Sequence, residues 1–141
     1  MKSNKTLFHF SLLLLYVVFA VSCASMKNPS LIYYTDQNNN SFTISPSSLT
    51  YQGTKIENSS SGLYSGGKDR QIKISRPIFE KIHKLAETLL LDTSNHAERR
   101  EMRTAILQVG DPSAGQRVMI YPSAEREKLE ELLSDILKDR E

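Results

Sequence analysis

Apolar residues recur at helical spacing in two segments of the chain. In the first, residues 76–91, the apolar positions are Ile78, Phe79, Ile82, Leu85, Ala86, Leu89 and Leu90. In the second, residues 124–138, they are Leu129, Leu132, Leu133, Ile136 and Leu137. Spacings of three and four residues place each set on one face of a helix, opposite charged residues. The pattern therefore predicts two amphipathic helices, each with one face buried against another element.

Both predicted helices begin after a serine. Ser75 and Ser123 stand where N-caps are expected, and Pro77 falls in a first turn, where its missing N–H costs nothing. The opposite face of the second helix carries several charged residues. Those that we expect on its solvent side are Arg126, Glu127, Glu130 and Glu131.

Short alternating segments predict β-strands in the rest of the chain. Residues that favour turns separate them, and the loop 110–115 joins the last two segments as a hairpin. The segment 92–100 is predicted to be a polar connector. The predicted strands cover residues 31–34, 41–44, 49–51, 71–74, 102–109 and 117–121.

The order of these elements favours a single small α+β domain over residues 31–141. A few strands come first, followed by a helix, a hairpin and the second helix. Amphipathic helices bury their apolar faces when they cover a sheet. We therefore expect a two-layer sandwich, in which a short, mostly antiparallel sheet carries the helices 76–91 and 124–138 on one face.

The beginning of the chain has the pattern of a secretory signal peptide. Lys2 and Lys5 precede an apolar run at 10–21, FSLLLLYVVFAV, and the small residue Ser22 leads to Cys23. A basic start, an apolar middle and a small-residue exit are typical of such signals, so residues 1–22 are predicted to be removed. The apolar run is shorter than the roughly 20 residues that a membrane-spanning helix needs.

Because the segment ends at a cysteine, it resembles a bacterial lipoprotein signal. Ser22 fits the family pattern, whereas Ala20 stands where Leu is preferred and Val21 where Ala, Ser or Thr is preferred. The resemblance implies acyl chains on Cys23 that anchor the protein to a membrane, with residues 23–30 as a tether. Ala24 lacks the acidic character that favours the inner membrane, so the expected site is the outer membrane, facing the periplasm. An ordinary cleaved signal or an uncleaved membrane helix remain as alternatives.

Charge and cysteine content narrow the function classes. The chain has 18 basic and 16 acidic residues, but Lys2 and Lys5 belong to the leader, so the remainder is balanced. No basic stripe with interleaved aromatic residues is present, which argues against a nucleic-acid partner. Cys23 is the single cysteine, and with its thiol acylated no disulfide or thiol chemistry remains. His83 and His96 are isolated, without metal-ligand spacing, so neither a metal nor another cofactor is expected.

The segment 59–67, SSSGLYSGG, is the most distinctive stretch after the leader. Glycine-rich loops can present backbone N–H groups to a ligand, and the candidate residues here are Gly62, Tyr64, Gly66 and Gly67. The segment lacks the P-loop and dinucleotide-binding patterns, so a flexible connector is the alternative. The string is similar to one in small, uncharacterised exported lipoproteins, over about residues 42–90 of this chain. That resemblance implies no activity.

These observations favour a non-enzymatic envelope lipoprotein, a binding or accessory module whose partner is an envelope protein or a glycan. No G-x-S-x-G motif or other spaced catalytic set is present. Two alternatives stay open. One is an inhibitor of a periplasmic hydrolase, which would insert the loop 62–67 or 110–115 into its target. The other is a cryptic hydrolase that uses Asp92, His96 or Asp111.

Overall fold

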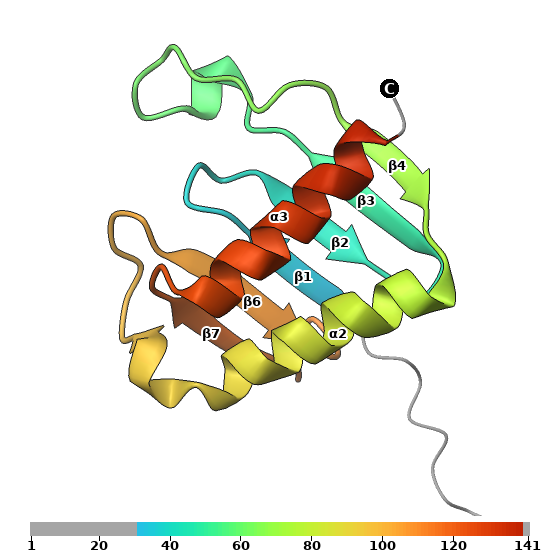
Figure 1. Cartoon of the computed structure of the whole chain (residues 1–141). Helices are drawn as coiled ribbons and strands as arrows, with labels where there is room; N and C mark the ends of the chain where they lie inside the picture. The colour runs from blue at the N-terminus through green and yellow to red at the C-terminus, as the bar shows by residue number, and fades with distance from the viewer. Residues whose placement is uncertain (1–30, 140–141) are drawn as a thin grey trace, which may run out of the picture.

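The computed structural model describes residues 31–139, and the predicted signal peptide 1–22, Cys23 and the tether 23–30 lie outside these residues. Seven strands of the described part form one antiparallel sheet in the order β4-β3-β2-β1-β6-β7-β5 (Figure 1). The strands are β1 (Ile32–Thr35), β2 (Ser41–Ile44), β3 (Ser48–Gln52), β4 (Arg70–Lys73), β5 (His96–Ala97), β6 (Ala105–Val109) and β7 (Gln116–Ile120).

Within residues 31–139, two α-helices and two short 3₁₀ turns accompany the sheet. The helices are α2 (Arg76–Leu91) and α3 (Ala124–Lys138), and the 3₁₀ turns are η1 (Ile56–Asn58) and η2 (Thr93–Asn95). In Figure 1 both helices cross the same face of the sheet. The predicted α+β class is therefore confirmed, with both helices at the predicted bounds. No helix within residues 31–139 is long and apolar enough to cross a membrane.

The core lies between the sheet and the helices. Because side chains alternate along a strand, every second residue points toward the helices. The strand residues buried there include Ile32, Tyr34, Phe42, Ile44, Leu49, Tyr51, Ile72, Ala105, Leu107 and Ile120. The helices contribute Phe79, Ile82, Ala86, Leu89, Leu90, Leu129, Leu133 and Ile136. Full burial of each larger side chain stabilises the fold by about 1.5–3 kcal/mol.

Two predicted boundaries near β6 are wrong. The predicted connector 92–100 contains β5, in which His96 pairs with Ile120 of β7. Strand β6 begins at Ala105 instead of residue 102, and Met102 is 91% exposed. A turn takes the place of the first predicted residues, closed by the Thr104 hydroxyl, which donates to the Glu101 carbonyl at 2.7 Å. Strand β5 depends on pairing with β7, and the late start of β6 depends on the Thr104 contact. Neither can be seen in the alternation of apolar and polar residues along the sequence.

The two predicted N-caps differ. The Ser123 hydroxyl accepts a hydrogen bond from the Arg126 backbone N–H at 3.2 Å, as expected for a cap. Ser75 makes no such side-chain bond, and only its carbonyl accepts from the Phe79 N–H. Both serines occupy the predicted N-cap positions, but only Ser123 caps its helix with its side chain.

Strand register divides the loops between the two edges of the sheet at which the strands begin and end. The described chain starts at Leu31, whose carbonyl accepts from the Gly110 N–H at 2.9 Å. The turn 45–47 and the loop 110–115 share this edge, which we call the proximal edge. The loops 36–40, 53–69 and 98–104 lie at the opposite, distal edge. The two edges are about 13 Å apart along a four-residue strand.

Candidate functional site

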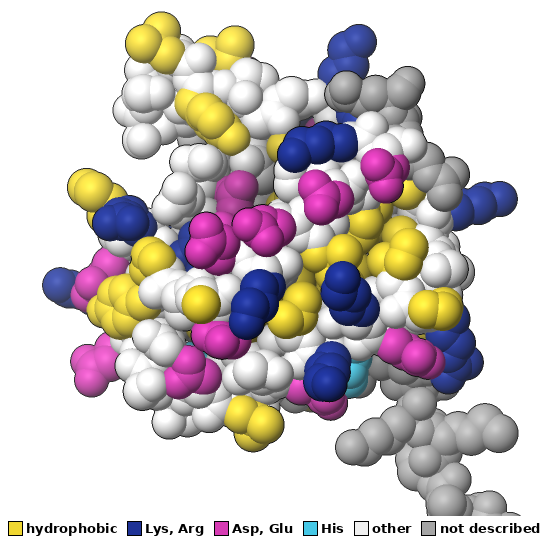
Figure 2. Space-filling model, in the orientation of Figure 1, with side chains coloured by type: hydrophobic (Ala, Val, Ile, Leu, Met, Phe, Trp, Pro, Cys, Tyr) yellow, Lys and Arg dark blue, Asp and Glu magenta, His cyan; other side chains and the backbone are white. Residues whose placement is uncertain are grey.

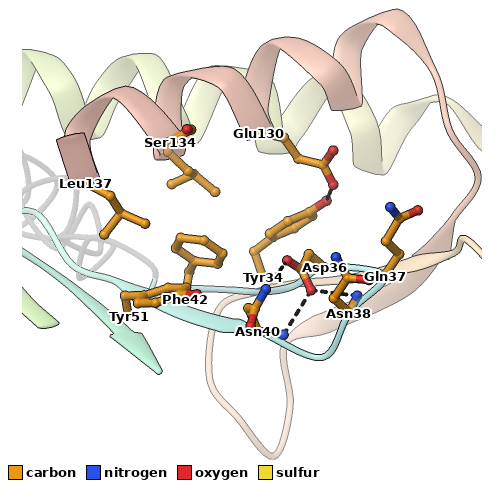
Figure 3. Close-up of a pocket in the computed structure, with 11 residues that line it drawn as sticks. Tyr34, Asp36, Gln37, Asn38, Asn40, Phe42, Tyr51, Glu130, Ser134 and Leu137 are labelled. Atoms are coloured by element: carbon orange, nitrogen blue, oxygen red, sulfur yellow. Dashed lines mark hydrogen bonds between the residues drawn. The ribbon is translucent and has the colours of Figure 1, made fainter. Parts of the chain in front are cut away.

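A pocket of about 270 Å³ opens at the distal edge, between α3 and the turn that joins β1 to β2 (Figure 3). Aromatic side chains form its floor, residues of α3 form its roof, and polar side chains of the turn form its rim. Its lining residues are Tyr34, Phe42, Tyr51, Glu130, Leu133, Ser134, Leu137, Asp36, Gln37, Asn38 and Asn40. A cavity with apolar walls and a few converging polar groups is the usual form of a small-molecule site.

The aromatic floor follows from strand register. Tyr34 pairs with Phe42, and Phe42 pairs with Tyr51, so three rings from adjacent strands fall in one row on the helix side of the sheet. The ring centroids are 6.1 Å apart for Tyr34 and Phe42, and 5.0 Å for Phe42 and Tyr51, with tilted planes. Tilted aromatic contacts at these distances are favourable, so the row gives the pocket a firm base.

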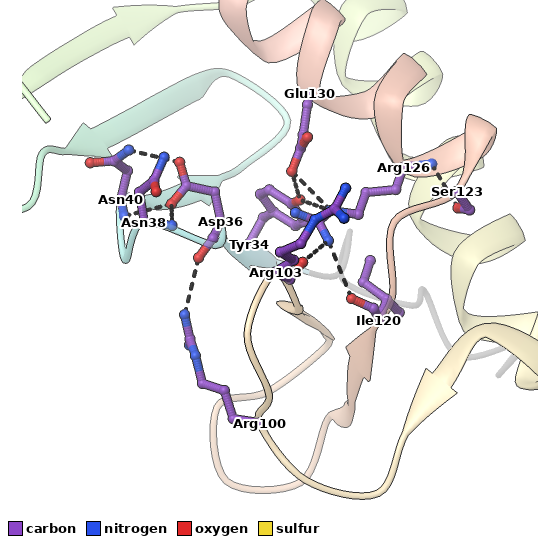
Figure 4. A network of polar contacts seen from close by, with 10 residues as sticks. All are labelled: Tyr34, Asp36, Asn38, Asn40, Arg100, Arg103, Ile120, Ser123, Arg126 and Glu130. Carbon is purple, nitrogen blue, oxygen red and sulfur yellow. Dashed lines mark hydrogen bonds and ion pairs between the residues drawn. The ribbon is translucent and has the colours of Figure 1, made fainter. Parts of the chain in front are cut away.

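A buried arginine fixes α3 over this floor (Figure 4). Arg126 is only 3% exposed. Its Nε atom donates to the Tyr34 hydroxyl at 3.2 Å and to Glu130 Oε1 at 2.9 Å. Its Nη1 atom donates to the carbonyls of Arg103, at 2.6 Å, and Ile120, at 3.4 Å. The charge of the guanidinium is thus balanced by one carboxylate and spread over several acceptors.

The predicted solvent position of Arg126 is therefore wrong. It lies three residues before Leu129 and seven before Leu133, which places it on the buried face of α3. Glu130 lies at the border, partly exposed, and it also accepts a hydrogen bond from the Tyr34 hydroxyl. The prediction of a solvent-facing side chain is confirmed for Glu127 and Glu131.

The protonation of Tyr34 and Arg126 is fixed at neutral pH. Burial raises the pKa of the Tyr34 phenol far above its ordinary value, and the hydrogen bond to Glu130 raises it further. Burial lowers the pKa of Arg126, but interactions with Tyr34 and Glu130 outweigh that effect and raise it overall. The phenol keeps its proton and the guanidinium keeps its charge. The cluster therefore positions the roof of the pocket instead of exchanging protons.

The rim is a turn organised by Asp36. One carboxylate oxygen accepts from the backbone N–H groups of Asn38, at 2.8 Å, and Asn40, at 2.9 Å. The other accepts from Asn40 Nδ2 at 2.7 Å. Across the turn, the Arg100 guanidinium donates to the Asp36 carbonyl at 3.1 Å. These hydrogen bonds fix the backbone of the rim in one conformation.

Asn40 connects the rim to the glycine-rich loop. It is only 5% exposed, and its Nδ2 atom also donates to the Tyr64 hydroxyl at 2.8 Å. Its Oδ1 atom accepts from the Thr54 backbone N–H at 3.0 Å. A buried amide with this many partners acts as a joint between three segments of the distal edge.

The four predicted loop residues have different positions. Tyr64 lies behind Asn40 and does not line the pocket. Gly66 packs so closely that a Cβ atom would lie 2.0 Å from Asn40 Oδ1, and its carbonyl accepts from the Tyr51 hydroxyl. Gly67 has a φ of +86°. Gly62, with nothing within 4 Å of a Cβ atom, belongs to the exposed tip. Tyr64 and Gly66 therefore tie the loop to the back of the pocket rim.

The candidate hydrolase residues lie in two places. Asp92 closes the η2 turn, where hydrogen bonds from Ser94 and Asn95 lower the pKa of its carboxyl group. His96, directly after that turn, has its Nε2 atom 2.9 Å from the Leu89 carbonyl oxygen. These two residues are neighbours, but the Asp92 carboxylate and His96 Nε2 are held by local hydrogen bonds.

Asp111 lies at the other end of β7. It belongs to the proximal loop, where hydrogen bonds from the Ser113 hydroxyl and N–H lower the pKa of its carboxyl group. His96 pairs with Ile120, at the distal end of the same strand. The length of a strand thus separates Asp111 from the other two candidates. Within residues 31–139, no group of three or more His, Cys, Asp or Glu side chains could hold a metal ion.

Sequence reasoning missed the pocket itself. Tyr34, Phe42 and Tyr51 were visible as aromatic residues of predicted strands, but only register shows that they align. Asp36 and Asn40 were visible only as residues that favour a turn. The useful signal was an aromatic residue at the helix-facing position of three consecutive predicted strands.

No protein-family model, curated protein or solved structure matches this chain.

Proposed function

We propose that this protein is a non-catalytic binding module of the bacterial cell envelope, anchored through acyl chains on Cys23 and facing the periplasm from the outer membrane. The distal pocket is its ligand site. The observation that carries this proposal is the place of the pocket, which opens at the edge of the sheet opposite the start of the described chain.

The position of the pocket matters because of the tether. Residues 23–30 number eight and span at most about 28 Å when fully extended. A chain anchored at Cys23 enters the domain at Leu31, on the proximal edge. The distal edge then lies farther from the bilayer and meets the aqueous side, where a soluble or wall-bound ligand has access to it.

The lining chemistry favours an uncharged, polyhydroxylated ligand. Asp36 and Glu130 contribute carboxylates, Gln37 and Asn38 contribute amides, and in the described part of the chain no Lys or Arg lines the pocket. Anionic ligands therefore lack a cationic partner. A saccharide ring combines hydroxyl groups with an apolar face, which suits polar side chains above an aromatic floor. We therefore propose a glycan as the ligand.

Two measurements test the proposal. The first is the mass of the N-terminal peptide of the protein taken from membranes, beside a Cys23→Ala variant. An acylated Cys23, lost in the variant, supports the anchor. An unmodified N-terminus or an intact leader contradicts it.

The second measurement is calorimetric titration with N-acetylglucosamine tetrasaccharide, an uncharged glycan probe. Binding should weaken in Gln37→Ala, at the rim, and in Ser134→Leu, which fills the pocket from its roof. Gln116→Ala, exposed on β7 away from the pocket, is the matched control and should bind as the unchanged protein does. Absence of saturable binding, or equal loss in Gln116→Ala, contradicts a glycan site here.

A second candidate, an inhibitor of a periplasmic hydrolase, draws support from one feature. Leu63 is 87% exposed at the tip of the glycine-rich loop, as expected for a side chain that another protein's cleft receives. If this proposal holds, the protein should slow a hydrolase from a periplasmic panel, and Leu63→Asp should abolish the effect. A panel without any slowed enzyme counts against it.

A further inference from the structure

A second concave surface lies on the outside of the helix pair, away from the pocket. It is a groove of about 500 Å³ between α2 and α3, with the partly buried Leu85 and Leu132 among its lining residues. Figure 2 shows hydrophobic side chains reaching the surface between the helices, with charged side chains on both sides. None of the distal pocket's lining residues belongs to this groove.

The two banks of the groove differ in charge. Lys81 and Lys84 stand on the α2 bank, whereas Glu131 and Asp135 stand on the α3 bank. Lys128, also on α3, is 3.8 Å from Glu125 and is partly neutralised by it. The groove therefore has an apolar centre, a basic side and an acidic side.

Within residues 31–139, the basic residues on one side of the groove do not form ion pairs with the acidic residues on the other side. Among the described residues, Lys81, Lys84 and Glu131 form no ion pair within 4.0 Å. Asp135 lies 3.8 Å from the neighbouring Lys138. These charges face outward and remain available to another molecule.

The pattern is self-complementary under a two-fold rotation. The helices run in opposite directions (Figure 1), and both lysines and both carboxylates line the groove. From these directions we infer that Lys81 is at about the level of Asp135 and Lys84 at about that of Glu131. A rotation by 180° about an axis along the groove places α2 of one copy over α3 of another at the same level. Both lysines then meet both carboxylates, and Leu85 meets Leu132.

We propose that this groove is the interface of a homodimer, in which the occupant is the same groove of a second copy. Such an isologous contact forms each opposite-charge pair twice. The helices are about 24 Å long, so the interface is at the small end of specific interfaces and should be weak, in the micromolar range. Because this inference uses none of the pocket residues, it stands or falls independently of the glycan proposal.

Sedimentation equilibrium of the full chain in mild detergent tests the proposal. From 1 to 500 µM the unchanged protein should shift from monomer to dimer. The double variants Lys81→Glu/Lys84→Glu and Glu131→Lys/Asp135→Lys should each weaken association at least tenfold. A mixture of the two variants should form a heterodimer, because the reversed charges again complement each other.

Matched controls separate this interface from general charge effects. The double variant Lys55→Glu/Lys68→Glu changes charge equally on exposed positions of the distal loop and should dimerise as the unchanged protein does. Circular dichroism checks that each variant is folded. A monomer throughout the concentration range overturns the proposal without any variant. Unweakened association of both groove variants, or a mixture that stays monomeric, overturns it as well.

Discussion

The two helices cover the same sheet but are held there by different forces. Five buried apolar side chains hold α2, and its ion pair Arg76–Glu80 is on the exposed surface. A polar contact of α2 is at its end, where His96 Nε2 lies 2.9 Å from the Leu89 carbonyl oxygen. Helix α3 buries three large apolar side chains and adds the Arg126 cluster near its start. Near its end, Arg70 Nη1 donates to the Leu137 carbonyl at 2.8 Å.

This difference has a structural meaning. Apolar contacts are non-directional, so they fix the distance of a helix from a sheet better than its rotation or its position along its axis. Hydrogen bonds depend on angle and distance, so they define both. Helix α3 supplies the roof of the pocket, and it is the helix whose position is defined by polar contacts at both ends.

The largest expected effect comes from removing the polar attachment of α3. Arg126→Met should lower the free energy of unfolding by about 3 kcal/mol, because Glu130 and the Arg103 carbonyl lose a buried partner. Urea unfolding followed by circular dichroism measures this change. The control is Lys128→Met on the same helix, where the side chain is 62% exposed and the change should stay within about 0.5 kcal/mol. Equal effects of the two substitutions would remove the distinction between the helices.

A smaller effect is expected behind the rim of the pocket, where Gly66 packs against Asn40. Gly66→Ala places a Cβ atom against Asn40 and the Thr54 N–H, so it should cost about 2 kcal/mol and separate the loop from the rim. Gly62→Ala is the control for backbone strain alone, because its φ is +66° but its surroundings are open, and about 1 kcal/mol is expected. Thermal unfolding compares the two. A loss in Gly66→Ala within about 0.5 kcal/mol, the range of an ordinary surface substitution, would show that close packing at Gly66 is unimportant.

The third prediction concerns pH. Tyr34→Phe should cost about 1–2 kcal/mol at pH 7 through its lost hydrogen bonds. In the unfolded chain the tyrosine ionises near its ordinary pKa of about 10, whereas in the folded protein burial raises the pKa of Tyr34, so the phenol keeps its proton. The stability that this proton provides is complete below pH 10 and falls as the pH rises above it.

The Phe variant lacks this loss, so the difference in stability between the two proteins should shrink between pH 8 and pH 10.5. Urea unfolding at both pH values measures it. Tyr51 and Tyr121, whose pKa values are also raised, are present in both proteins and contribute equally. A difference that stays constant or grows with pH would contradict the buried, protonated phenol.

The smallest predicted effect compares the two N-caps. Ser123→Ala should cost about 1 kcal/mol, since it removes the hydrogen bond to the Arg126 N–H, whereas Ser75→Ala should cost only a few tenths. Urea unfolding of the two variants gives the values. A larger loss of stability in Ser75→Ala than in Ser123→Ala would contradict the view that Ser123, and not Ser75, caps its helix with a side-chain hydrogen bond.

Sequence periodicity was sufficient to predict the helices and most strands, because the spacing of their apolar residues follows from one buried face. It failed at β5, since two residues carry too little pattern and His96 becomes a strand residue only through Ile120. It failed at Arg126 because a charged residue was assigned to solvent, although its partner Tyr34 is 92 residues away in the sequence. The pocket likewise depends on register, which joins Tyr34, Phe42 and Tyr51 across three strands.

The two outer strands of the sheet affect how readily copies of the protein aggregate at high concentration. At one end β5 has only two residues, and at the other β4 carries Arg70 and Lys73. A very short or charged outer strand gives a foreign strand little open backbone to pair with. Molecules at high local concentration therefore have a poor template for edge-to-edge aggregation, and contacts between them are left to side chains.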